Sequence, residues 1–121
     1  YNSRMGADSN NPIIAIKSEL QMAETARIGG NKGKARVCAR RAAGWAIREW
    51  QSQHGILERD GSAYWYLQVA AMDRSLPTDI RVAAGNLIMR INEEHNLPVG
   101  ADVLDDARAL VDFFLASDNG P

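Results

Sequence analysis

The stretch KGKARVCARRAAGWAIREWQSQH, residues 32–54, decides the fold that the sequence predicts. It reads as one long helix. On a helical wheel of about 100° per residue, its small and apolar side chains share one arc. The members of this arc are Ala35, Cys38, Ala39, Ala42, Ala43, Ala46 and Trp50. Because most of them carry a single methyl group, we expect a partner helix to pack closely against this face.

Basic residues lie on the far side of the same helix. Lys34, Arg41 and Arg48 recur every seven residues, so each is displaced by only about 20° from the previous one. Arg36 and Arg40 form a second, shorter cationic line. The first line is typical of a solvated helix face, and it is also a candidate surface for binding nucleic acid through phosphate contacts, without catalysis.

Two residues of this helix need an explanation. Gly44 lies between the cationic lines and costs about 1 kcal/mol of helix propensity relative to alanine. Either another element approaches the backbone there, or the glycine is tolerated on a solvated face. Glu49 falls within the alanine arc, where an unpaired carboxylate would be costly, so we expect it to have a basic partner.

The other predicted helices surround this one. They cover residues 12–28, 63–72, 77–91 and a last segment that begins at Asp102, with Asn10 or Asn11 and then Ser62 as N-caps. The short Gly29-Gly30-Asn31 loop predicts an antiparallel hairpin of the first two helices. We therefore expect an all-α, compact bundle of four or five mostly antiparallel helices.

Length and composition restrict the class of protein. A chain of 121 residues indicates one domain, residues 11–118, preceded by a flexible segment, residues 1–10. One interpretation of residues 1–4, which precede Met5, is an expression remnant, and no function is assigned to them. No apolar run reaches the roughly 20 residues of a membrane span, and no secretory signal is visible, so we expect a cytoplasmic protein without membrane contact.

The content of reactive residues excludes several kinds of site. With Cys38 as the single cysteine and two histidines, no cluster has the spacing of a zinc site, and we expect neither a metal nor a cofactor. No glycine-rich phosphate loop and no Gly-x-Ser-x-Gly elbow is present. The net charge of -1 hides an asymmetry, since residues 32–48 carry six basic side chains and no acid, whereas residues 102–112 carry four acids and one arginine.

Arg90 and His95 are the pair best suited to catalysis. A permanent cation and a side chain that titrates near neutrality could cleave RNA without metal, because His can move a proton while Arg stabilises the charged phosphorane. Five residues on a regular helix separate side chains by about 140°, so the helix would have to end between them, as Pro98 favours. Glu93 and Glu94 beside His95 would repel phosphate.

The order of these features resembles the HEPN superfamily over residues 12–116: a helical hairpin, an alanine-rich second helix, and an Arg near the end of the fourth helix before a final DARALV helix. The resemblance implies an all-α bundle that dimerises. It implies that Arg90 and His95 are the catalytic pair of a metal-independent RNase or toxin component, supported by Glu49. Ile91 departs from the superfamily pattern, in which a polar residue usually follows the Arg.

Three hypotheses follow for the function. Because the superfamily also contains catalytically silent members that pair with small nucleotidyltransferases, the preferred one is a non-catalytic interaction domain that forms a homodimer or binds such a partner. The second is the RNase that uses Arg90 and His95. The third is RNA or DNA binding through Lys34, Arg41 and Arg48. In the first case Arg90 is a structural ion-pair partner of Glu49 or of an acid in the last helix, and His95 is an ordinary loop histidine.

On the RNase hypothesis, the purified protein cleaves single-stranded RNA in the presence of a metal chelator. Both His95→Ala and Arg90→Ala then lower the cleavage rate by about 10²- to 10⁴-fold, because each removes one of the two reacting groups. A gel assay of a labelled oligonucleotide measures the rate. RNA that stays intact with the folded wild-type protein would rule this hypothesis out.

Overall fold

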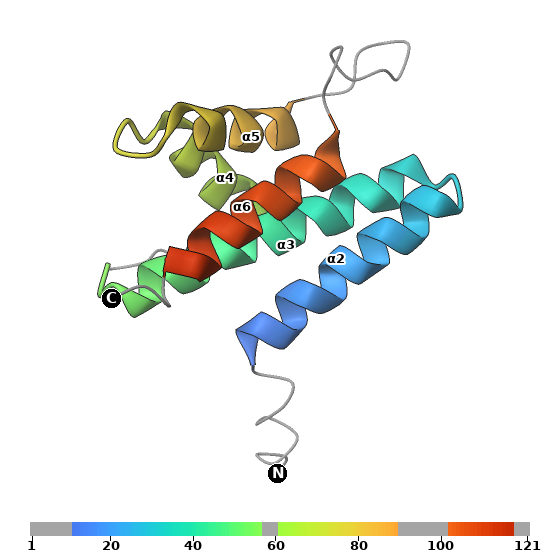
Figure 1. Ribbon diagram of the computed structural model, residues 1–121, viewed down its shortest axis with the longest axis horizontal. Helices are drawn as coiled ribbons and strands as arrows, with labels where there is room; N and C mark the ends of the chain where they lie inside the picture. The colour runs from blue at the N-terminus through green and yellow to red at the C-terminus, as the bar shows by residue number, and fades with distance from the viewer. Residues whose placement is uncertain (1–10, 57–60, 90–101, 118–121) are drawn as a thin grey trace.

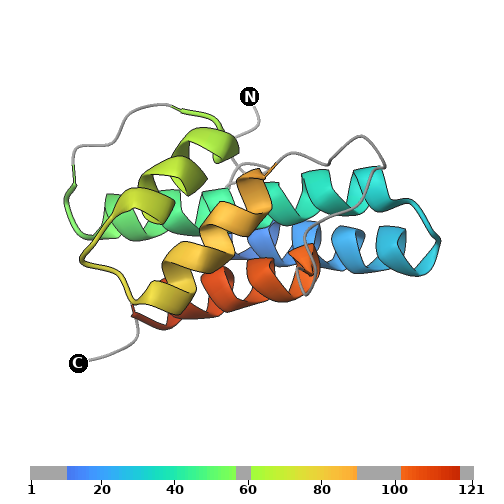
Figure 2. The same cartoon turned by 90° about the horizontal axis from the view of Figure 1, so that it is seen from above.

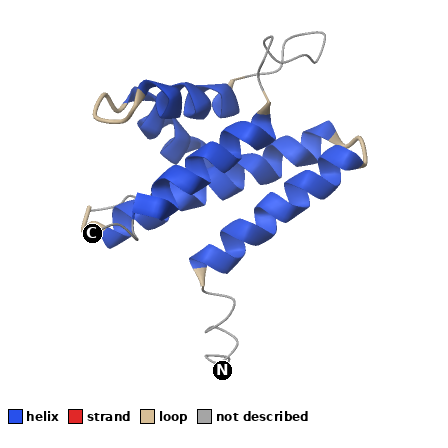
Figure 3. Cartoon of the chain, viewed as in Figure 1, coloured by secondary structure: helices blue, strands red, loops and turns tan. Residues whose placement is uncertain are grey.

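The structure is a computed structural model that describes residues 11–56, 61–89 and 102–117. These residues form five helices and no strand, so the predicted all-α class is confirmed (Figures 1 and 3). The helices are α2 (Pro12–Ile28), α3 (Lys32–Gln53), α4 (Ala63–Met72), α5 (Thr78–Ile88) and α6 (Val103–Ser117).

Side-chain caps account for where α2 and α4 begin. Asn11 accepts hydrogen bonds from the backbone N–H groups of Ile13 and Ile14, at 2.9 and 3.3 Å. Ser62 accepts one from Trp65 at 3.2 Å. Both caps were predicted, and each satisfies backbone donors that a helix start leaves without a partner.

Two predicted boundaries were wrong by a few residues. Asp102 does not lie in the first turn of the last helix; it precedes α6, and its carboxylate accepts from the N–H groups of Leu104 and Asp105 at 2.9 and 3.1 Å. The fourth predicted helix was expected to run from Pro77 to Ile91, but α5 begins at Thr78 and ends at Ile88. Met89 is extended, and Ile91 lies outside the described residues.

The long helix α3 is the centre of the fold. Helices α2, α4 and α6 all pack directly against it, and α5 packs mainly on α4 and α6 (Figures 1 and 2). The arc predicted from the wheel is buried: Ala39, Ala42, Ala43 and Ala46 have no exposed surface, and Cys38 is 2% exposed. Larger side chains from the other helices fill the remaining core, among them Tyr66, Leu67, Leu87, Leu104, Leu110 and Phe114.

The first two helices form the predicted hairpin. Figure 1 shows α2 running back along α3 from the tight turn that joins them. Gly30 has a φ of 82°, a conformation that suits glycine because it has no Cβ. The hairpin brings Glu19 of α2 to 3.9 Å from the guanidinium of Arg41 on α3.

At Gly44 the helices α3 and α4 come into close contact. A Cβ placed on this glycine would lie 2.6 Å from both the Cα and the Cβ of Ala63, the first residue of α4. No real Cβ tolerates such a distance, so α4 can sit here only because residue 44 lacks a side chain. The interpretation in which Gly44 lies on a solvated face was wrong, because α4 covers that side of α3.

We expect Gly44→Ala to destabilise the fold by about 1–3 kcal/mol, since overpacking at Ala63 outweighs the gain in helix propensity. Gly85→Ala is the matched control in α5, because a Cβ there meets nothing within 4 Å. It is expected to be neutral or stabilising by up to about 1 kcal/mol. Urea denaturation monitored by circular dichroism measures both variants, and equal stabilities would contradict the close contact.

Candidate functional site

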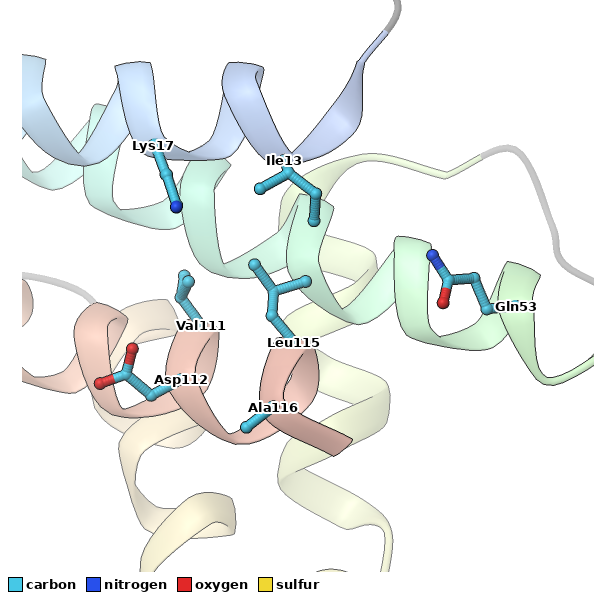
Figure 4. A pocket seen from close by; sticks show the side chains of 7 residues that line it. All are labelled: Ile13, Lys17, Gln53, Val111, Asp112, Leu115 and Ala116. Atoms are coloured by element: carbon cyan, nitrogen blue, oxygen red, sulfur yellow. The ribbon is translucent and has the colours of Figure 1, made fainter. Parts of the chain in front are cut away.

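A groove opens between α2 and α6 on the surface of the bundle (Figure 4). Its volume is about 590 Å³, and it is lined by Ile13, Lys17, Gln53, Val111, Asp112, Leu115 and Ala116. In Figure 4 the side chains of Ile13 and Leu115 point toward each other across it. The middle of the groove is therefore apolar, and its charged groups stand on different helices, Lys17 on α2 and Asp112 on α6.

Two ion pairs hold α2 against α6 further along. Arg27 lies 3.1 Å from Asp102, and Arg108 pairs with Glu24. These contacts join the C-terminal half of α2 to the N-terminal half of α6. The groove lies beyond them, beside the first two turns of α2, which carry Ile13 and Lys17.

The sequence did not predict this groove. Ile13 of α2 is only partly buried and forms one wall of the groove. The signal that was available lies on α6, where Asp105, Ala109, Asp112 and Ala116 recur at intervals of four, three and four residues. This spacing keeps them on one face, and all four are exposed.

The predicted nucleic-acid residues all lie on one exposed side of α3. Lys34, Arg41 and Arg48 are exposed, and we call these three residues the basic stripe. Arg41 keeps half of its side chain exposed although it lies 3.9 Å from Glu19. The Glu19 side chain is only 12% exposed, so its negative charge offsets part of the charge of Arg41, while the exposed half of Arg41 still contributes to the surface.

Arg36 and Arg40 are not a second solvent-facing line. Arg36 donates to the backbone carbonyl of Met89 at 2.8 Å, and Arg40 donates to the carbonyls of Leu87 and Met89. Burial lowers the pKa of Arg40, and the positive charge of Arg36 lowers it further. The two arginines thus satisfy carbonyl groups at the end of α5, a helix end that favours positive charge.

Glu49 is partly buried, and its described partner is Gln53, whose amide donates to the carboxylate from one turn further along α3. The predicted pair with Arg90 is not tested, because Arg90 and His95 lie outside the described residues. Whether these two residues converge, and whether Glu49 supports them, stays a prediction.

Cys38 has the environment of a structural thiol. Burial and a hydrogen bond to Glu19 raise its pKa, so the thiol stays protonated at neutral pH. Because the nucleophile of a thiol enzyme is the thiolate, this environment argues against covalent catalysis by Cys38.

The described residues contain neither a candidate metal-binding cluster nor a helix that could span a membrane. No three His, Cys, Asp or Glu side chains in this part of the chain come together in a group that could hold a metal ion. Within the same residues, no helix has the length and apolar character that crossing a bilayer requires.

Comparisons with known proteins give no relative for this chain. No protein-family model matches it, and neither the curated proteins nor the solved structures contain a significant match. The resemblance to the HEPN superfamily therefore stays a prediction.

We expect Arg40→Met to lower stability by about 1–3 kcal/mol, because it leaves the carbonyl of Leu87 buried against α3 without its donor. Lys34→Met is the matched control, an exposed basic residue of the same helix, and should stay within about 0.5 kcal/mol of wild type. Urea denaturation measures both variants. Equal losses would show that Arg40 contributes no more than a surface charge.

Proposed function

We propose that this chain is a non-catalytic interaction domain that associates with a second copy of itself. The observation that carries the proposal is the groove between α2 and α6. It offers apolar surface from the partly exposed side chains of Ile13 and Leu115, which a partner helix can cover. Burying apolar area contributes about 25 cal/mol per Å², so covering this surface favours association.

The composition of the groove supports binding over catalysis. Its lining contains no cysteine, histidine or serine that could serve as a nucleophile or a proton-transfer group at neutral pH. Its two charged side chains, Lys17 and Asp112, have opposite signs. Opposite charges around an apolar centre are suited to fixing the orientation of a docked helix.

The charge distribution of the chain supports a second copy as the partner. The outer side of α3 exposes the three cations of the basic stripe, while α6 exposes the carboxylates of Asp105 and Asp112. A surface of each sign is thus available on every molecule.

The proposed setting is the cytoplasm. Cys38 is buried and free, and it is the single cysteine of the sequence. A chain with one cysteine cannot form an internal disulfide, so an oxidising compartment would not stabilise it in this way.

The test of self-association is sedimentation equilibrium of wild type, Ile13→Gln and Ile14→Gln. Ile13 lines the groove, so its polar substitution should lower the association constant by about tenfold, the effect of losing roughly 1.4 kcal/mol of apolar burial. Ile14 is 54% exposed and lies about 100° further around α2, so its substitution should have little effect.

Circular dichroism and thermal unfolding check that both variants keep the wild-type fold. A wild-type protein that sediments as a monomer at every concentration would overturn the proposal of self-association. If Ile13→Gln and Ile14→Gln associate equally strongly, the groove is not the site of self-association.

A further inference from the structure

We infer that the basic stripe of one copy docks on the outer face of α6 and into the adjoining groove of the next copy, head to tail. This inference rests on the proposed self-association and specifies the two surfaces that meet. We call the exposed side of α6, formed by Asp105, Ala109, Asp112 and Ala116, the acidic face.

The acidic face and the groove form one continuous surface. Asp112 and Ala116 belong to both, since they also line the groove beside Val111 and Leu115. A helix that lies on the acidic face therefore reaches the apolar groove with the same side. Ala109 lies between the two carboxylates and Ala116 lies one turn beyond them, and both are small, so a partner helix can approach α6 closely there.

The spacing of charges matches between the two surfaces. Asp105 and Asp112 are seven residues apart, about 10.5 Å along the helix, and so are consecutive members of the basic stripe. Seven-residue repeats on both helices drift by about 20° per step, so the two rows stay in register over this length. Two carboxylates can thus meet two cations at once.

The basic stripe also carries apolar surface for the groove. Val37 lies between Lys34 and Arg41 on the outer side of α3 and is 43% exposed. The aliphatic stems of lysine and arginine can cover apolar surface while their charged ends reach a carboxylate at the rim. The stripe can therefore supply the apolar contacts of the groove and the cations for Asp105 and Asp112.

The positions of the two surfaces make the contact head to tail. Trp50 of α3 packs against Phe114 of α6, with ring centroids 5.8 Å apart. On their helices, Arg48 is about 160° around from Trp50, and Asp112 is about 160° around from Phe114. The basic stripe and the acidic face thus lie on opposite outer sides of the α3–α6 pair, and one molecule cannot join its own two surfaces.

A contact between different surfaces of identical chains is heterologous, and it repeats until a ring closes or an open chain grows. The head-to-tail contact therefore predicts oligomers beyond the dimer as concentration rises. Because the facing charges are exposed before binding, it also predicts association that weakens with salt.

The test is a charge swap read by sedimentation velocity. One variant carries Asp105→Lys and Asp112→Lys, and the other carries Lys34→Glu and Arg41→Glu. In a solution of either variant alone, the two surfaces that would meet carry charges of the same sign. The association constant of each variant should therefore fall at least about tenfold. An equimolar mixture again places opposite charges at every contact and should restore assembly.

Controls keep the experiment decisive if a double variant is destabilised. Lys34→Glu alone should weaken association, whereas Lys32→Glu changes the charge equally in the same turn but lies about 160° around α3 from Lys34 and should not. Wild type is compared at ionic strengths of about 0.01 M and about 1 M, where the Debye length falls from about 30 Å to about 3 Å.

The outcomes separate this inference from the proposed function. If Ile13→Gln weakens association while both charge variants associate as wild type does, the groove forms another kind of dimer and the head-to-tail contact is wrong. A mixture that stays as dissociated as its components also overturns it. If wild type is monomeric at both ionic strengths, self-association itself fails. If the monomeric protein binds a single-stranded RNA oligonucleotide through the basic stripe, the stripe serves to bind nucleic acid and the head-to-tail contact is wrong.

Discussion

The dense packing of small side chains along α3 is the constraint on which the rest of the structure depends. Ala39, Ala43 and Ala46 are fully buried, and at Gly44 the first residue of α4 approaches so closely that even a methyl group would not fit. Short side chains let α2, α4 and α6 all pack closely against α3. In return, α3 can expose only a narrow strip to solvent, and any function of its charged residues is confined to that strip or to contacts within the bundle.

This geometry divides the arginines of α3 between two roles. Arg40 lies on a side that another helix covers, and its guanidinium satisfies carbonyl groups at the end of α5. Arg41, the next residue, is about 100° further around and keeps half of its side chain at the surface. Neighbours in the sequence with the same chemistry therefore do different things: one stabilises the fold, and the other contributes to the surface field.

The near-neutral chain has charged surfaces of both signs. The net charge of -1 would suggest weak electrostatics, yet cations line the outer side of α3 and carboxylates line the outer side of α6. Separated surfaces of opposite sign, one of them beside an apolar groove, support the proposed association between copies of the chain. Charges dispersed evenly over the surface would offer no such complementary faces. On the proposed self-association, the same separation would orient each molecule before contact, because the potential of one face attracts the opposite face of another copy.

The sequence alone determined the helices, the hairpin and the buried side of α3, because these follow from the 3.6-residue periodicity and from caps such as Asn11 and Ser62. It also identified the basic stripe. Only the tertiary structure decided that Gly44 receives α4, that Arg36 and Arg40 bind the end of α5, and that a groove remains between α2 and α6. Periodicity says which side of a helix is apolar, but which element covers that side, and where two helices leave space unfilled, depends on packing between residues far apart in the chain.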